Sequence, residues 1–242
     1  MSVGPFVRYY GGKWRAAPRY PAPECRRIVE HFAGFAGYSC RYPHHNVVLI
    51  DKDPIIAGIW AYLIKATPEE ILALPDIPEG GSTDDLPVCQ EARWLAGFWC
   101  NNGVAQPCKT PSKWCRESHA LIGWSQPIRE RIAAGVPRIK HWRIIHGSYE
   151  DAPRGEATHF VDPPYQTAAG RHYKHSDVDY QALGAHCLAL EGQVIAMDQV
   201  GAHWMPWTGT ISIHSTPTHG SSISKEVLYH RSNQPSLFGG AA

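Results

Sequence analysis

Four consecutive residues, Asp162-Pro163-Pro164-Tyr165, combine groups that could hold an amino group in place. A carboxylate only accepts hydrogen bonds and proline has no backbone N–H, so this turn offers an incoming amine several oxygens and few competing donors. The tyrosine adds a flat surface on which a base could stack, worth about 1–3 kcal/mol per base. The tetrapeptide predicts a clamp for the exocyclic amine of a base. The alternative is an ordinary turn after a strand.

A second candidate segment lies near the N-terminus, where Tyr9 and Gly11 precede Lys13 in Arg8-Tyr9-Tyr10-Gly11-Gly12-Lys13. Adjacent glycines let a backbone approach a ligand closely, and a lysine can pair with a carboxylate. A phosphate-binding loop is the competing interpretation. It does not fit the pattern, because Trp14 follows Lys13 where Ser or Thr is expected and no strand precedes the glycines.

Two further segments have the form of a nucleotide-binding unit. An apolar strand beginning at Arg27 runs into a loop of small residues that contains Gly34. The strand Val47–Ile50 then ends in Asp51, seventeen residues after Gly34. This distance is near the roughly 20 residues expected between a glycine loop and the acid that accepts ribose hydroxyls. We assign Asp53 mostly to capping a helix that begins near Pro54.

Together these segments resemble the Dam-type DNA adenine-N6 methyltransferases of bacteria and phages. That family combines Asp-Pro-Pro-Tyr with an N-terminal aromatic-x-Gly-Gly-Lys and a Glu-Pro-Phe-x-Gly-x-Gly loop, in the order found here. The resemblance implies S-adenosylmethionine as cofactor and implies that Asp162, Pro163, Pro164 and Tyr165 hold a flipped adenine. The cofactor-binding residues that it implies are Tyr9, Gly11, Lys13, Phe32, Gly34, Asp51, Ser148, Tyr149 and Asp162.

The glycine loop departs from the family pattern at two positions. His31 stands where proline is usual, and Ala36 stands where the second glycine is usual, with Gly37 directly after it. A shifted loop with modestly weaker cofactor binding would follow from these departures. They also leave open a catalytically degenerate DNA-binding module on the same scaffold.

The order of elements predicts an α/β fold, with a Rossmann-like methyltransferase sheet and an antiparallel edge hairpin. A helical run at 180–190 precedes a strand at 193–197, and alternating residues at 211–213 and 226–229 suit closing antiparallel strands. We divide the chain into an N-terminal catalytic part (1–75), an insertion (76–142), a C-terminal catalytic part (143–231) and a tail (232–242).

The insertion differs in composition from the rest of the chain. Basic residues and tryptophans, among them Trp94, Trp99 and Trp142, crowd between Val88 and Trp142, which suits phosphate contact and base stacking. In the resembled family this slot holds the target-recognition domain, so we expect a mainly helical DNA-binding region. The expected DNA contacts are Lys109, Lys113, Trp114 and Arg116. The alternative is that several tryptophans are core residues, Trp94 first among them because it lies four residues before Phe98.

Composition adds limits to this interpretation. The chain has 242 residues, 43% of them hydrophobic, and a formal net charge of +1, so any DNA-binding surface must be local. No apolar run approaches the length of a membrane span, and we expect a monomer in the cytoplasm of a bacterial host cell. Seven cysteines with no Cys-x-x-Cys spacing favour reduced thiols and fit no zinc finger, so no metal is expected.

The last segment carries a separate motif. Gln234, Leu237 and Phe238 form Gln-x-Ser-Leu-Phe, which resembles the short peptides with which bacterial replication proteins bind the sliding clamp. The alternative is a hydrophobic tail that packs on its own domain.

The function expected from these patterns is methyl transfer from S-adenosylmethionine to the N6 amine of a flipped adenine in double-stranded DNA. Because the clamp suits any exocyclic amine, methylation of cytosine-N4 or of a single-stranded nucleic acid is the alternative within the same class.

Overall fold

The computed structural model describes residues 2–117, 123–215 and 222–233, and these residues form one seven-stranded sheet in the order β3-β2-β1-β4-β5-β7-β6. The strands are β1 (Arg27–Glu30), β2 (Asn46–Asp51), β3 (Arg143–His146), β4 (Ala157–Val161), β5 (Gly192–Gln199), β6 (Gly209–Ser215) and β7 (Ser222–Arg231). Strands β1 to β5 are parallel, whereas β7 pairs antiparallel with both β5 and β6. The predicted Rossmann-like α/β fold with an antiparallel edge hairpin is therefore confirmed.

The order of the parallel strands fixes where a ligand can bind. Strand β1 lies between β2 and β4. The chain adds β2 and β3 on one side of β1, and then crosses over to add β4 and β5 on the other side. In doubly wound sheets, ligands bind in the crevice outside the carboxyl ends of the strands at this switch point.

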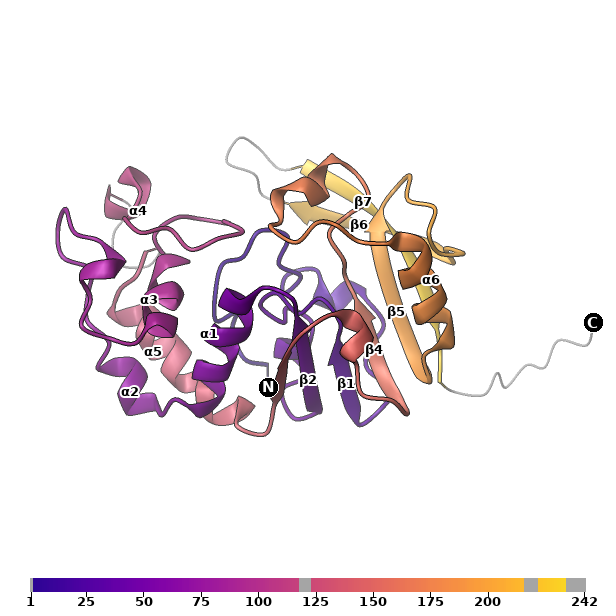
Figure 1. The fold of residues 1–242 in the computed structure, drawn as a ribbon, viewed down its shortest axis with the longest axis horizontal. Coiled ribbons are helices and arrows are strands. Elements are labelled where there is room, and N and C mark those ends of the chain that lie inside the picture. The colour runs from indigo at the N-terminus through magenta and orange to yellow at the C-terminus, as the bar shows by residue number, and fades with distance from the viewer. Residues whose placement is uncertain (1, 118–122, 216–221, 234–242) are drawn as a thin grey trace, which may run out of the picture.

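The α-helices lie mainly beside one end of the sheet. They are α1 (Pro54–Lys65), α2 (Pro68–Leu72), α3 (Gln90–Gly97), α4 (Lys113–Glu117), α5 (Gln126–Gly135) and α6 (Tyr180–Ala189). Short 3-10 helices span Ala17–Arg19, Ser39–Arg41, Thr83–Asp85, Val136–Ile139, Tyr149–Asp151 and Ala168–His172. Figure 1 shows α2 to α5 gathered beyond α1, while α6 lies beside β5 at the other end.

Local sequence explains where these helices begin. Asp53 caps α1, because its Oδ1 accepts the amide hydrogen of Ile55 at 2.9 Å, and Pro54 occupies the first helical position. The predicted capping role of Asp53 is confirmed. Asp179 caps α6 in the same way through the amide of Ala182, at 3.0 Å.

Several tryptophans of the insertion belong to the core. Trp99 and Trp142 expose 1% and 2% of their surface, and their indole N–H groups donate to the carbonyls of Phe6 and Pro43, each at 3.2 Å. Trp94 packs partly buried on the same core cluster, which also contains residues of β1 and β2. The prediction that the tryptophans serve base stacking is wrong for Trp99 and Trp142, and the packing role of Trp94 is confirmed. Composition alone could not separate core from surface tryptophans, because their burial depends on contacts with segments far away in the chain.

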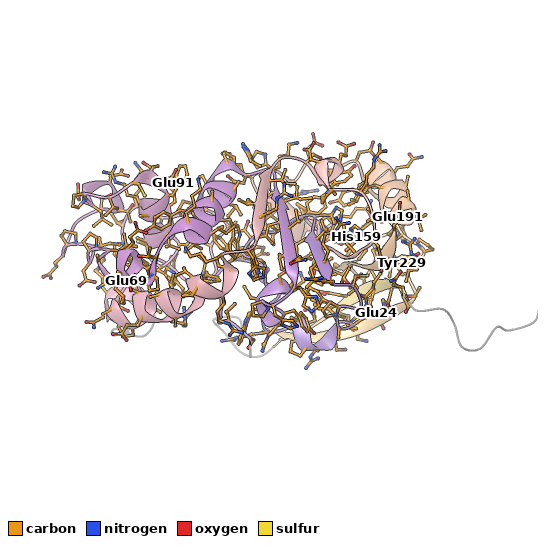
Figure 2. All side chains as sticks on the ribbon, turned by 90° about the horizontal axis from the view of Figure 1, so that it is seen from below. Glu24, Glu69, Glu91, His159, Glu191 and Tyr229 are labelled. Atoms are coloured by element: carbon orange, nitrogen blue, oxygen red, sulfur yellow. The ribbon has the colours of Figure 1, made fainter. Side chains whose placement is uncertain are left out.

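The labelled side chains of Figure 2 mark the two ends of the molecule. Figure 2 shows Glu69 and Glu91 on the helical side and Glu24, His159, Glu191 and Tyr229 on the side of the sheet. His159 on β4 reaches the carbonyl of Glu191 at 3.1 Å.

None of the helices in the described residues is long and apolar enough to cross a membrane. All seven cysteines are free thiols.

The N-terminal segment lies directly against the loop that follows β1, and Gly37 permits this contact. A Cβ atom at position 37 would lie 2.5 Å from the backbone nitrogen of Trp14 and 2.8 Å from the backbone nitrogen of Lys13. Because backbone atoms cannot yield as a flexible side chain can, only glycine fits. This contact places Lys13 above the carboxyl ends of the central strands.

Substituting Gly37→Ala should displace the N-terminal segment and lower the free energy of unfolding by about 1–3 kcal/mol, the usual cost of overpacking. Thermal unfolding followed by circular dichroism measures this loss. Gly209→Ala is the matched control, because a Cβ there meets no atom within 4 Å. Equal melting temperatures for the two variants would contradict the packing described.

Candidate active site

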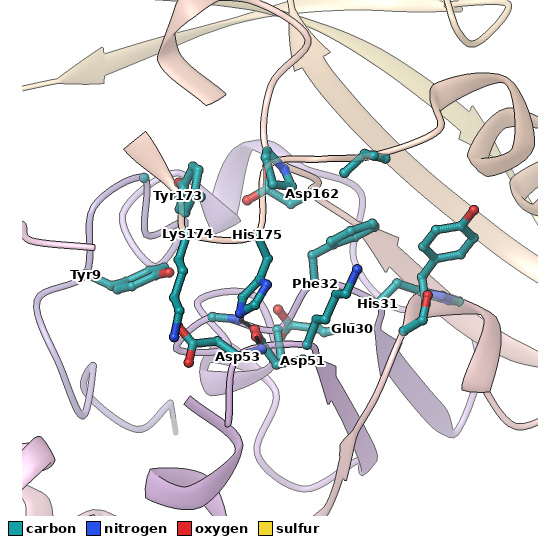
Figure 3. Close-up of a pocket in the computed structure, with 18 of the residues that line it drawn as sticks. Tyr9, Glu30, His31, Phe32, Asp51, Asp53, Asp162, Tyr173, Lys174 and His175 are labelled. Atoms are coloured by element: carbon teal, nitrogen blue, oxygen red, sulfur yellow. Dashed lines mark hydrogen bonds between the residues drawn. The ribbon is translucent and has the colours of Figure 1, made fainter. Parts of the chain in front are cut away.

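A cavity of about 340 Å³ opens at the switch point of the sheet. Its wall is formed by residues that follow β1, β2, β3 and β4, together with the N-terminal segment (Figure 3). Every residue predicted to bind the cofactor lines this cavity: Tyr9, Gly11, Lys13, Phe32, Gly34, Asp51, Ser148, Tyr149 and Asp162. The structure thus brings these residues together, and their individual roles stay predictions.

The glycine loop is tied to the end of β2 through Asp51. One carboxylate oxygen accepts the amide hydrogen of Gly34 at 2.8 Å, and the other accepts that of Asp53 at 2.9 Å. Burial raises the pKa of Asp51 to about 6, while the two amide donors act in the opposite direction. Asp51 is therefore largely ionised at neutral pH, and a carboxylate has lone pairs left for further donors.

Ala36, which stands where the resembled family has glycine, has an unusual backbone conformation. Ala36 has φ +49°, in the left-handed region that glycine normally occupies, and Gly34 has φ +45°. A non-glycine residue there carries strain of roughly 1–2 kcal/mol. The loop is therefore folded as a glycine loop even though the second glycine is missing, so the expectation of a shifted loop is not needed to explain the fold.

A buried ion pair joins the N-terminal segment to the predicted clamp. The Nζ atom of Lys13 lies 2.6 Å and 2.8 Å from the two carboxylate oxygens of Asp162. The side chains of Lys13 and Asp162 expose 9% and 18% of their surface. The motif placed Lys13 at the cofactor site but did not indicate this partner, which comes from a residue 149 positions away.

The electrostatics of this pair set the state of both groups. Burial opposes the charge of Lys13, but the carboxylates of Asp162 and Glu226 outweigh it and raise the pKa of Lys13 above its usual range. Burial raises the pKa of Asp162 to about 6, Lys13 lowers it, and Glu226 raises it. Asp162 is thus mainly a carboxylate at neutral pH, which makes it a hydrogen-bond acceptor.

The other residues of the tetrapeptide stand around Asp162. Pro164 lines the cavity, and its carbonyl accepts the hydroxyl of Tyr180 at 2.6 Å. Pro163 is buried and does not line the cavity, so its contact with a target amine stays a prediction. Tyr165 lies outside the cavity wall, with the Lys13 ammonium 4.9 Å from its ring centre.

Glu226 and Tyr20 were not identified from the sequence. The Tyr165 hydroxyl donates to Oε1 of Glu226, and the Tyr20 hydroxyl donates to Oε2 at 2.6 Å. Both residues come from segments without a recognised motif. The only sequence signal was a glutamate at the start of the apolar strand run 226–229, and alternation does not say which face of a strand is buried.

The segment after the tetrapeptide forms the opposite wall of the cavity. The Tyr173 ring lies 6.0 Å from that of Tyr9, and its hydroxyl donates to the carbonyl of Tyr10 at 3.2 Å. Figure 3 shows Lys174 and His175 extending toward the side of the cavity that carries Asp53 and Asp51. No sequence motif marked this stretch, yet residues 173–175 line the cavity.

Two aromatic rings, from residues that follow β1 and β3, line one part of the cavity. The rings of Phe32 and Tyr149 lie 5.7 Å apart with 31° between their planes. Behind them, Nε2 of His31 lies 2.9 Å from Nδ1 of His159, and both histidines are almost fully buried. Burial lowers the pKa of His159 to about 4 and holds that of His31 well below its usual value.

The predicted DNA contacts lie elsewhere. Lys109 is exposed and forms an ion pair with Asp84 at 2.6 Å, and Arg116 is exposed and donates to the carbonyl of Pro111. Lys113 is exposed at the start of α4. Trp114 belongs to the same helix, but its side chain lies outside the described part of the structure. None of the three described side chains lines the cavity.

Two other predictions have no further support. The tail residues Gln234, Leu237 and Phe238 lie outside the described residues. Within the described ranges, no group of three or more His, Cys, Asp or Glu side chains is arranged to hold a metal ion.

Comparison with known proteins gives distant structural likenesses. The sequence matches no family model and no curated protein. A solved structure described as a putative RNA methyltransferase from Pyrococcus horikoshii has 10% identity and a TM-score of 0.39, covering 91% of this chain and 80% of that one. A putative methylase from Haemophilus influenzae has 10% identity and a TM-score of 0.34, covering 90% and 92%. At these scores neither likeness supports a functional assignment.

The buried pair of His31 and His159 makes stability depend on pH. Because the pKa of His159 is lowered, this side chain stays neutral in the folded state while it binds a proton in the unfolded state. The free energy of unfolding therefore decreases as pH falls from about 6.5 toward about 4. Replacing His159→Phe should make unfolding less pH-dependent between about pH 7.5 and about pH 5, by roughly 1–3 kcal/mol. Urea unfolding at both pH values measures this difference.

His44→Asn removes an exposed histidine instead and serves as the control. The raised pKa values of Glu30, Asp51 and Asp162 act with the opposite sign, since these groups bind protons in the folded state over the same range. They are present in all three proteins and cancel in the comparison. Identical pH slopes for wild type and His159→Phe would show that the histidine pair is not held neutral.

Proposed function

We propose that this protein is an S-adenosylmethionine-dependent methyltransferase that modifies the N6 amine of a flipped adenine in double-stranded DNA. One observation carries the proposal. The ionised Asp162 stands at the edge of a cavity at the switch point of a Rossmann-like sheet, and the cavity wall also carries Asp51.

The cavity has the size and the groups that this cofactor requires. Its volume, about 340 Å³, falls within the range of roughly 300–1,000 Å³ typical of small-molecule sites. Asp51 can accept ribose hydroxyls, and Phe32 with Tyr149 offers ring faces to an adenine. The Asp162 carboxylate gives the cavity a negative group that suits a cation. When bound, S-adenosylmethionine supplies a sulfonium-activated methyl group.

The clamp residues would act chiefly by alignment. Flipping a base out of the duplex costs a few kcal/mol, and stacking on the Tyr165 ring would offset part of this cost. Asp162 and the Pro163 carbonyl would then accept the two amine N–H groups and aim the nitrogen at the methyl group. Holding reacting atoms in line can supply a large part of the rate enhancement.

Lys13 does not block this role of Asp162. A carboxylate offers about four lone-pair positions, so Asp162 can accept from the ammonium and from the amine together. Lys13 also favours the ionised form of Asp162. The amine becomes acidic as the new N–C bond forms, so a weakly basic carboxylate is sufficient to receive its proton.

We also propose that exposed basic residues of the insertion contact DNA phosphates. Lys109, Lys113 and Arg116 are exposed beside or within α4, where phosphate oxygens could reach them. Binding of the tail, through Gln234, Leu237 and Phe238, to a bacterial sliding clamp is a separate proposal that depends on the sequence motif alone.

Mass identification of the methylated nucleoside tests the proposal. Purified protein incubated with unmethylated duplex DNA and labelled cofactor should yield N6-methyladenine. Asp162→Ala should lower kcat by about 100- to 1,000-fold, because a properly placed hydrogen-bonding group in a transition state contributes on this scale.

The same assay separates the other candidates. N4-methylcytosine as product would change the target base to cytosine but leave the role of the Asp162–Tyr165 tetrapeptide unchanged. Methylation of single-stranded DNA alone would exclude double-stranded DNA as the substrate. Absence of cofactor binding would indicate a degenerate scaffold, and full turnover by Asp162→Ala would contradict the clamp itself.

A further inference from the structure

Glu226 is a buried carboxylate behind the clamp that the proposed mechanism does not use. It lies on β7, the antiparallel strand next to β5, and exposes 5% of its surface. Its two oxygens accept the hydroxyl hydrogens of Tyr165 and Tyr20, and Oε1 lies 3.8 Å from the Lys13 ammonium. It is not part of the cavity wall. Glu226 therefore contacts Tyr165, Tyr20 and Lys13 without lining the cavity.

We infer that Glu226 is a positioning residue, which fixes the ring of Tyr165 and the ammonium of Lys13 relative to Asp162. The inference deepens the proposed function and rests on it, because the ring is the expected stacking surface for the target base. A tyrosine side chain turns about two bonds, and anchoring its hydroxyl oxygen, which lies on the axis of the second bond, restricts rotation about the first and so fixes where the ring lies. Tyr20 in turn holds the second oxygen of Glu226 at 2.6 Å.

The charge of Glu226 matters as well as its hydrogen bonds. Asp162 and Glu226 are two carboxylates that share the single ammonium of Lys13, with nitrogen–oxygen distances of 2.6 Å and 3.8 Å. This arrangement leaves an excess of negative charge behind the reacting atoms. In a buried site of low dielectric constant, such an excess favours a cationic group more than it would in water. A sulfonium or a newly methylated amine is such a group.

The ionisation of Asp162 reports on this arrangement. The titratable groups that act on or respond to the Asp162 charge are Lys13 and Tyr9 in the N-terminal segment, Tyr20, Glu30 on β1, Tyr165, Tyr173, Asp198 on β5 and Glu226 on β7. After burial and Lys13, Glu226 has the largest influence, and it raises the pKa of Asp162. Removing its charge should therefore lower that pKa.

Nuclear magnetic resonance of the full chain with carbon-13 carboxyl-labelled aspartate tests this sign without substrate or activity. Asp162→Asn assigns the signal. The wild-type midpoint should lie at about 6, and Glu226→Gln, which keeps the volume and an acceptor, should shift it to lower pH. Lys225→Gln changes one charge on an exposed neighbour in β7 and should leave the midpoint unchanged. An unchanged midpoint in Glu226→Gln would overturn the inference.

A double-mutant cycle tests the positioning role in catalysis. Glu226→Gln and Tyr165→Phe should each lower kcat by about tenfold, the scale of one hydrogen bond to a charged group, and leave the KM for cofactor unchanged. Because both substitutions weaken the same contact, the double variant should lose far less than the product of the two losses. Fully multiplicative losses, or a change confined to KM, would overturn the inference.

The two experiments separate failure of the inference from failure of the proposed function. Absence of methyl transfer by the wild-type protein would refute the proposed function, whereas the Asp162 titration would still be measurable. A shifted midpoint with no catalytic coupling would restrict Glu226 to electrostatics and reject its positioning role.

Discussion

The ion pair between Lys13 and Asp162 is the contact on which the site depends. It connects a segment at the start of the chain with the residue that follows the central strand β4, and its atoms approach to 2.6 Å. A buried ion pair contributes little net stability, because desolvation offsets the attraction, but loss of one partner leaves an uncompensated charge at a cost of about 3–5 kcal/mol. The pair therefore fixes positions more than it stabilises the fold.

The surrounding structure supplies what this pair requires. Gly37 lets the backbone of Lys13 lie against the loop after β1, so the ammonium reaches the carboxyl end of β4. The antiparallel hairpin brings Glu226 to the far side of the ammonium. In this way the antiparallel strand β7, which lies between β5 and β6, becomes part of the electrostatic environment of the clamp. The residues around Tyr173 complete the cavity wall, and the Tyr173 hydroxyl donates to the N-terminal segment at Tyr10.

The sequence predicted those parts of the site that follow from local rules. Asp51, Ser148 and Asp162 each come just after or at the end of a strand, and parallel strands bring such residues to one edge of the sheet. The cap at Asp53 needs only its neighbours. The tryptophans were harder to assign, because Trp99 and Trp142 become core residues only through packing between distant helices and the N-terminal segment.

The remaining parts depend on contacts between positions far apart in the chain. Glu226 meets Tyr20 across 206 positions, and no local pattern encodes the register that brings them together. The role of residues 173–175 was missed because a polar stretch without secondary structure reads the same whether it covers a cavity or joins two elements. The left-handed backbone at Ala36 could not be predicted, because glycine usually adopts this conformation and the sequence has alanine there.

A crystal structure of the protein with S-adenosylhomocysteine tests the central claim most directly. We expect the ligand in the cavity at the switch point, with ribose oxygens within hydrogen-bond distance of Asp51 and the sulfur directed toward Asp162. The Lys13–Asp162 pair should persist beside it. A ligand bound elsewhere, or an orientation that turns the sulfur away from Asp162, would contradict the account.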